Sequence, residues 1–576
     1  MISRFSGSNY KAFANFDLEL KPITILLGAN SSGKSALINS LLMLSQSADA
    51  SVISEAPLRL NGSKTGMGET LNIIKDKDPA NKLTFVFELE DKEALKKQIS
   101  DAKSICMENH DTVVRYLMFM VGNAITGAAN TKVESFNKIA KKIEDISIHS
   151  PNASGTRSQR LKKFPEYYTK LIKCYRSILV DGTKTRNMPS EFVSISEKSS
   201  LQKIDDCFSS FLAVPTNKIT PARISYTFSY NKRLERLQVS EYVLYNRLNN
   251  VIISVNKDGN NIQVFSDVIN QAAISRSRSE IIKLITFDSL EISTSRETPT
   301  YGFGSFAFFK GGVSPFATLI AQFIRTTSKH LLSNFAGLQI NHVSPLRAFP
   351  QRYYLLDKSV NHRKLNALDG TELAEVLKNN PKIKENINLL FATYNIGIDV
   401  EKVNDIIYKI VVNQDSVNLE LTDVGFGISQ VLPILVQAYL SPKNSLTIIE
   451  QPEIHLHPNM QAWLTDALIN IALSESKKFL IETHSDALIR RVRLRIVDDS
   501  SKLSEDDVGI YHLHKDRQNK CTLLDKIEIN DNGDIKWPKD FMDVEIKDTI
   551  QIQQLKYEKI KKDIFQNSSS GEKING

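Results

Sequence analysis

The chain has 576 residues, of which 41% are hydrophobic and 24% charged, and its formal net charge is +8. This length exceeds what one compact core needs, and the ordinary composition excludes a collagen-like or largely disordered protein. The small positive excess is compatible with a nucleic-acid partner but does not require one. The four cysteines are widely spaced without a CxxC pair, which argues against a zinc framework. We find no signal peptide and no apolar run of about 18 residues, so we expect a cytoplasmic protein without membrane contact.

Residues 1–90 predict the N-terminal half of an α/β domain. The stretch 13–20 alternates as a strand does, and residues 22–28 ("PITILLG") form a buried strand that ends in a glycine. A helix is expected to begin at about Lys34, and residues 82–90 predict a further strand.

Residues 91–340 predict an insertion that is mainly helical with some strands. Apolar residues recur at helical spacing over 133–146 and again over 164–178. Strands are expected within 219–265, where "KDGNN" reads as a hairpin turn, and a helix near 315–335.

Residues 341–500 predict the C-terminal half of the same α/β domain. A helical stretch is expected near 371–393, strands near 398–422 and a helix over 459–474. We assign residues 501–560 to a small C-terminal α/β domain and residues 561–576 to a flexible tail.

The segment "GANSSGKS" follows the first buried strand and matches the pattern of a phosphate-binding loop. In such a loop, glycines let backbone N–H groups surround a phosphate chain, Lys34 supplies positive charge to the β- and γ-phosphates, and the hydroxyl of Ser35 binds Mg²⁺. The predicted nucleotide-binding residues are Gly28, Ala29, Asn30, Ser31, Ser32, Gly33, Lys34 and Ser35.

The segment "LTIIEQPEIHLHP" reads as a buried strand that ends in carboxylates. Glu450 occupies the place where phosphate-loop ATPases present the second Mg²⁺ contact, and Glu453 follows it closely. We expect Ser35 and Glu450 to hold the metal. The next position is Gln451, whose amide can orient a water molecule but cannot deprotonate it.

Each of two further segments has two possible interpretations, one functional and one purely structural. In "FLIETHSDALI", His484 follows a strand and could reach the γ-phosphate or its attacking water; alone, it would more often be a capping histidine. In "TDVGFGISQVLPILV", Gly425, Gly427 and Ser429 open an apolar helix, which is either an anion site or a simple helix cap.

Together these segments, with "SPLRAFPQRYY", resemble the stand-alone ABC-type ATPases of the OLD and Septu PtuA group, which are associated with bacterial anti-phage defence. The resemblance covers about 60% of the chain. It implies an ABC-type ATPase head, a phosphate-loop NTPase with a mixed sheet, that uses ATP and Mg²⁺. It also implies a homodimer or higher oligomer, in which Gly425, Gly427 and Ser429 of one subunit close on the γ-phosphate held by the other. His455 and His457 then lie in a loop that faces the dimer partner.

The chain departs from the usual ABC pattern and from the OLD nucleases, although the resembling defence ATPases can also read "EQPE". Gln451 stands where ABC-type ATPases usually have a catalytic glutamate, which predicts slow hydrolysis assisted by Glu453 or His484. Too few residues follow His484 for a fused Toprim nuclease, and "HLHKD" (512–516) lacks the frame of an HNH element. We therefore expect a partner nuclease, for example of the HNH type, to be a separate chain.

Two alternatives remain open. The protein could be a repair or chromosome-maintenance ATPase that grips DNA through basic segments such as 157–163 and 490–495. It could also be a nucleotide-dependent scaffold without turnover.

Overall fold

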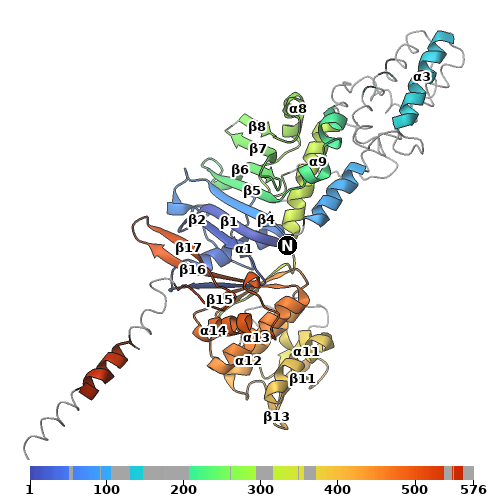
Figure 1. Cartoon of the computed structure of the whole chain (residues 1–576). Coiled ribbons are helices and arrows are strands. Elements are labelled where there is room, and N and C mark those ends of the chain that lie inside the picture. The colour runs from blue at the N-terminus through green and yellow to red at the C-terminus, as the bar shows by residue number, and fades with distance from the viewer. Residues whose placement is uncertain are drawn as a thin grey trace, which may run out of the picture.

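The computed structural model describes most of the chain. The described residues are 1–50, 56–90, 92–104, 130–146, 166, 170, 173, 206–259, 261–292, 315–347, 349–355, 372–537, 548 and 550–561. One large sheet runs through the middle of an elongated molecule, with β5–β8 towards one end and α11–α14 towards the other (Figure 1). Among the described helices, none is long and apolar enough to cross a lipid bilayer.

Within the described residues, thirteen strands form this sheet in the order β8-β7-β6-β5-β4-β1-β2-β17-β16-β3-β15-β14-β9. In chain order they are β1 (Ile2–Tyr10), β2 (Phe13–Glu19), β3 (Ile23–Gly28), β4 (Leu83–Leu89), β5 (Arg223–Asn231), β6 (Arg236–Tyr245), β7 (Val251–Asp258), β8 (Asn261–Phe265), β9 (Ile340–Val343), β14 (Leu446–Glu450), β15 (Lys478–Glu482), β16 (Val508–Asp516) and β17 (Cys521–Ile527).

The strands β16, β3, β15, β14 and β9 are mutually parallel. In the run from β8 to β2, each strand is antiparallel to its neighbours. All six residues of β3 are buried, because helices and loops cover both faces of the sheet here. Ile23, Ile25 and Leu27 point into one hydrophobic core and Leu26 into the other. The carboxyl ends of β3, β15, β14 and β9 therefore meet at one edge.

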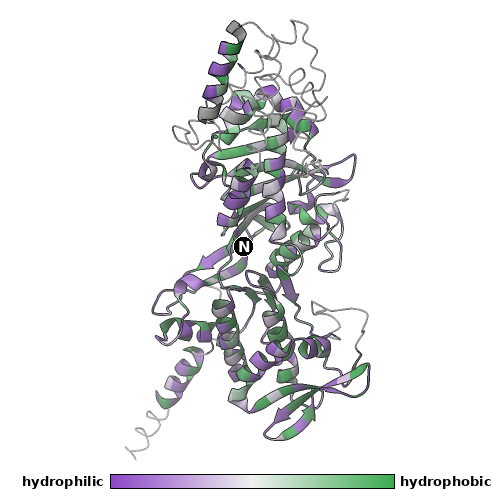
Figure 2. Cartoon of the chain, turned by 90° about the vertical axis from the view of Figure 1, so that its right-hand side faces the viewer, coloured by the Kyte–Doolittle hydropathy of each residue, from purple (hydrophilic) through white to green (hydrophobic). Residues whose placement is uncertain are grey.

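The helices divide between the two cores. The first core receives α1 (Lys34–Ala48), α3 (Asn130–Ile146), the short α7 (Thr216–Ile219), α8 (Gln271–Lys283) and α9 (Pro315–Ser333). The second receives α10 (Leu373–Asn379), α11 (Pro381–Phe391), α12 (Phe426–Leu440), α13 (Pro458–Glu475) and α14 (Asp486–Val497). In Figure 2, hydrophobic residues follow the central strands of the sheet.

A small antiparallel sheet lies beside α11 in the second half of the molecule. It consists of β10 (Tyr354–Leu355), β11 (Ile396–Lys402), β12 (Ile407–Gln414) and β13 (Val417–Glu420). The remaining short turns are η1 (Thr70–Ile73), η2 (Lys75–Lys77), a π-helical turn η3 (Asp206–Leu212), η5 (Ala392–Tyr394) and η6 (Glu505–Asp507).

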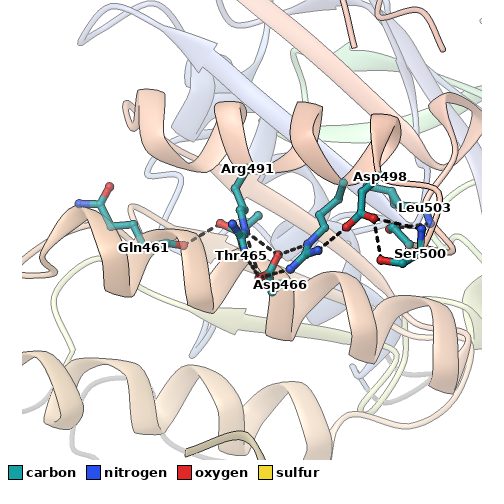
Figure 3. Close-up of polar contacts among 9 residues, drawn as sticks. Gln461, Thr465, Asp466, Arg491, Asp498, Ser500 and Leu503 are labelled. Atoms are coloured by element: carbon teal, nitrogen blue, oxygen red, sulfur yellow. Dashed lines mark hydrogen bonds and ion pairs between the residues drawn. The ribbon is translucent and has the colours of Figure 1, made fainter. Parts of the chain in front are cut away.

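The parallel core packs against a pair of helices held together by charge. In Figure 3, Asp466 of α13 lies beside Arg491 of α14, with Asp498 at the end of that helix. Nε of Arg491 donates to Asp466 at 2.9 Å, and Nε of Arg495 donates to the same carboxylate at 2.8 Å. Arg495 also reaches Asp498 at 2.6 Å. These charge-assisted contacts fix the direction in which α14 leaves β15.

Most predicted elements are confirmed, including helices α1, α3, α9 and α13 and the β7–β8 hairpin. The strand pairings bear on the predicted domain bounds, which stay a prediction. Strands β5 to β8 lie within the predicted insertion and continue the sheet of the head, because β5 pairs with β4. Strands β16 and β17 lie within the predicted C-terminal domain, and β16 inserts beside β3. Within the predicted helix over 164–178, the structure describes only residues 166, 170 and 173, all of them helical; the tail beyond residue 561 lies outside the described residues.

Candidate functional site

The phosphate-binding loop joins β3 directly to α1. Gly28 has a φ of 145° and Gly33 a φ of 109°, a backbone region that residues with a Cβ rarely adopt. A Cβ at Gly28 would lie 2.3 Å from the carbonyl oxygen of Leu513, because β16 runs alongside. Glycine is therefore required at Gly28 by conformation and by space. Ala29, Asn30 and Ser31 are exposed at the outer turn of the loop.

Lys34 is the first residue of α1 and turns back under the loop. Its Nζ donates to the carbonyl oxygens of Gly28 at 2.8 Å and Ala29 at 3.2 Å, and lies 3.6 Å from Oε1 of Glu482. Burial lowers the pKa of Lys34, whereas the charge of Glu482 raises it. The hydroxyl-bearing Ser35 follows on the exposed side of the helix.

Two carboxylates end adjacent strands next to this lysine. Glu450 of β14 and Glu482 of β15 are direct partners in the parallel register. Burial raises the pKa of Glu482 to about 7; Lys34 opposes this shift and Glu450 reinforces it. The sequence predicted a place in the site for Glu450 but no role for Glu482, although each ends a short, mainly apolar strand, "LTIIE" and "KFLIE".

These residues fit a magnesium ion that arrives with a nucleotide. Oε2 of Glu482 is buried without a hydrogen-bond partner, next to the carboxylate of Glu450. An unpaired buried oxygen costs free energy that a cation can offset. In the described part of the chain, no group of three or more His, Cys, Asp or Glu forms a ready metal cage. Mg²⁺ suits this arrangement, because it is commonly held by one or two carboxylates together with substrate phosphates.

Two residues that sequence analysis did not assign support the end of β14. His342 of β9 places Nε2 2.6 Å from Oε1 of Glu450. Arg347 donates from Nη2 to the carbonyl oxygens of Glu450 at 3.1 Å and Gln451 at 3.0 Å. Arg347 is only 7% exposed, and burial lowers its pKa to about 10. The available signal was a histidine within a short strand and an arginine shortly after it, in "QINHVSPLR".

The turn after Glu450 is tightly held. Gln451 adopts a φ of 45°, and its N–H donates to the carbonyl oxygen of Glu482 at 2.7 Å. Both oxygens of Glu453 accept hydrogen bonds: one from the hydroxyl of Thr483 at 2.8 Å and one from the N–H of His484 at 2.7 Å. Glu453 thus fastens the turn after β14 to the turn after β15.

His484 stands at the exposed rim of this edge. Burial of part of its ring and the charge of Lys34 lower the pKa of His484, whereas Glu453 opposes the shift. The imidazole is therefore neutral at pH 7. Ser485 caps α14 by accepting from the N–H of Leu488 at 3.1 Å and donates to Gln461 at 2.6 Å, which fixes the backbone beside the histidine.

The glycine turn lies at the start of α12. Gly425 is exposed, and a Cβ placed there would meet no atom within 4 Å. A Cβ at Gly427 would lie 3.6 Å from Leu456. Ser429 is only 3% exposed, so its hydroxyl faces the chain's own interior. In the loop before α13, His455 is exposed, while His457 caps the helix by accepting from the N–H of Asn459 at 3.3 Å.

A family model described as an AAA ATPase domain matches residues 327–489. The matched range includes β9, β14 and β15 but not the phosphate-binding loop. A comparison with curated proteins gave no match. The mixed α/β fold, with the loop at the end of β3, is that of a phosphate-loop NTPase head, as expected.

Solved structures that align with the chain include heads of SMC proteins. The SMC head domain from Thermotoga maritima has a TM-score of 0.31 and 7% identity, and the alignment covers 92% of this chain and 99% of that one. The Smc head with an extended coiled coil from Pyrococcus furiosus, bound to the C-terminal domain of ScpA, has a TM-score of 0.30 and 8% identity, with 92% and 96% covered. Scores this low do not establish a shared fold, so the fold assignment rests on the strands and the loop described above.

Proposed function

We propose that the protein is an ATPase that binds ATP with Mg²⁺ at the carboxyl edge of β3, β15 and β14 and hydrolyses it slowly. One observation carries this proposal: residues far apart in the chain, Lys34, Glu450 and Glu482, converge where a phosphate-binding loop ends. The convergence of a phosphate loop with strand-end acids is how such enzymes hold a nucleoside triphosphate.

Each residue has a distinct role in this proposal. Lys34 neutralises charge on the β- and γ-phosphates, and Ser35 and Glu450 hold Mg²⁺, which when bound neutralises developing charge on the transferred phosphoryl group. Gln451 orients the attacking water. The neutral imidazole of His484 can accept or donate a hydrogen bond at the γ-phosphate. Because Gln451 cannot take a proton, we expect turnover to be slow.

We further propose that two heads associate around ATP through the glycine turn. The exposed Gly425 and the half-exposed Gly427 at the N-terminus of α12 leave backbone N–H groups accessible to a phosphate held by a second copy. Ser429 would join this contact only if the first turn of α12 shifted, because its side chain is buried. ATP would then shift the population towards a closed dimer.

The biological setting is also a proposal. The sequence resemblance to the OLD and Septu PtuA group supports a sensor or regulator of a separate partner nuclease in anti-phage defence. The structure weakens one argument for the DNA-gripping alternative: in the segment 490–495, all four arginines have partners within the chain. These contacts are Arg490–Asp486, Arg491–Asp466, Arg493 to the Gly533 carbonyl and Arg495–Asp466. The segment 157–163 lies outside the described residues.

Phosphate release by the purified chain, with and without DNA, tests these proposals, with Lys34→Ala as the control that should not bind ATP. Slow, DNA-independent turnover with ATP-dependent dimerisation is expected. Strong DNA stimulation without a partner would favour the repair ATPase, and dimerisation without any turnover would favour the scaffold. Co-purification from the native host, with identification of bound chains, tests for the nuclease.

A further inference from the structure

Lys34 has three protein partners. Its ammonium group carries three donors, and the structure places around it the carbonyl oxygens of Gly28 and Ala29 and the carboxylate of Glu482. The side chains of Lys34 and Glu482 are 4% and 6% exposed, so solvent screens this pair only weakly. The β- and γ-phosphates of a nucleotide require the same donors.

Glu482 is the acidic member of this set. The carbonyl oxygens belong to the phosphate-binding loop and move with it, whereas Glu482 is fixed at the end of β15, where its carbonyl oxygen also accepts from the N–H of Gln451. A buried carboxylate next to Lys34 opposes a nucleotide in two ways. It competes for the ammonium group, and its negative charge repels the incoming phosphates.

The neighbouring strand adds a second negative group. Glu450 is the direct register partner of Glu482, so releasing Lys34 to the phosphates leaves two carboxylates and a phosphate chain at one edge of the sheet. Mutual repulsion among these groups is relieved when a divalent cation lies between them. The orphaned Oε2 of Glu482 is one oxygen that such a cation would satisfy.

We infer that Glu482 makes tight nucleotide binding conditional on a divalent cation, by competing with the phosphates for Lys34. This inference rests on the proposed ATPase function and names the ligand that the site prefers: a nucleoside triphosphate carrying its metal, rather than the free anion. Glu482 affects nucleotide binding through its charge and its position, and it takes no part in bond breaking.

The test measures ATP affinity at pH 8, above the pKa of Glu482, in EDTA and in Mg²⁺ for the wild type, Glu482→Gln and Glu450→Gln. In EDTA, Glu482→Gln should bind ATP about tenfold more tightly than the wild type, because the carboxylate that competes with the phosphates for Lys34 is removed. The increase in ATP affinity that Mg²⁺ produces should be correspondingly smaller in Glu482→Gln than in the wild type. Glu450→Gln is the matched control: it makes the same change on the adjacent strand, but Glu450 does not pair with Lys34, so its gain in EDTA should be clearly smaller.

Several outcomes separate the inference from the proposed function. If the wild type binds ATP, Lys34→Ala does not, and Glu482→Gln binds with unchanged or weaker affinity in EDTA, the inference is overturned while the ATPase proposal stands. If the wild type binds ATP in neither buffer, the proposed function itself fails. Thermal unfolding checks that each variant is folded. Glu482→Met, which has a similar shape without charge, should reproduce the tighter binding in EDTA.

Discussion

Nε2 of His342 lies 2.6 Å from Oε1 of Glu450, across the boundary between β9 and β14. His342 belongs to the strand next to the proposed metal-binding acid, and the contact joins an edge strand of the sheet to the site. A hydrogen bond of this kind holds a carboxylate in one orientation. Outer residues that orient metal-binding groups commonly affect metal affinity or activity about 10–100-fold.

Replacing His342 therefore tests whether this orientation matters. We expect His342→Phe to reduce ATP turnover about tenfold and to raise the Mg²⁺ concentration needed for half-maximal rate. ATP affinity in EDTA should stay unchanged, since His342 does not touch the phosphate-binding loop. His342→Asn, which retains a donor, should recover part of the loss. A uniform drop in affinity with and without metal would instead indicate that the fold is disturbed.

Arg347 gives a second prediction, because it contacts main-chain atoms. Arg347→Met removes the donor shared by the carbonyl oxygens of Glu450 and Gln451 and should destabilise the fold by about 1–3 kcal/mol. It should also lower kcat more than it changes KM, because the turn that carries Gln451 loses its support. Denaturant unfolding and steady-state kinetics measure the two effects. A stable variant with wild-type kcat would remove Arg347 from any positioning role.

Two glycines provide a matched pair. Gly28→Ala should cost at least about 1–3 kcal/mol and abolish ATP binding, because the new Cβ meets a β16 carbonyl oxygen and the φ of 145° is unfavourable. Gly425→Ala should change stability by no more than about 0.5 kcal/mol, since its surroundings are open. Thermal unfolding and ATP titration compare them. Reduced ATP-dependent dimerisation in the stable Gly425→Ala variant would support the glycine turn as the contact between heads; undiminished dimerisation would argue against it.

The contacts of Asp466 with two arginines predict that the stability of the fold depends on pH. Burial opposes ionisation, but hydrogen bonds from Arg495 and Arg491 win and hold the pKa of Asp466 below its ordinary value of 3.8. A lowered folded pKa means that the stabilisation is complete above pH 3.8 and is lost as the pH falls through the folded pKa. Asp466→Asn should therefore cost about 1–3 kcal/mol at pH 7, and its difference from the wild type should narrow only in acid. Urea unfolding between pH 3 and pH 7 measures this difference in the free energy of unfolding. A difference that stays constant at all pH values would contradict the prediction.

Local sequence patterns predicted the elements and part of the site. The strand before Gly28, the helix after Gly33 and the acid at Glu450 follow from short apolar runs and their polar ends, which need no knowledge of distant residues. Glu482, His342 and Arg347 were not assigned, because their importance depends on which strands are neighbours. Strand order is decided by packing across the whole sheet.

The same limit applies to the domain bounds predicted from the sequence. The residue pattern of β16 is the same whether the strand belongs to a small separate domain or to a central sheet. Their position beside β3 depends on the turn at Asp516–Cys521 and on the space left between β2 and β3, which local periodicity does not reveal.

The neighbours of β3 have a consequence for biosynthesis. In the described sheet, β3, which carries the phosphate-binding loop, pairs only with β15 and β16, and both are synthesised long after it. The nascent chain must therefore keep an apolar strand without its partners until β15 and β16 have emerged, a situation that slows folding and favours aggregation. The nucleotide site is completed only when β14 and β15 have emerged, so fragments released before them would lack it.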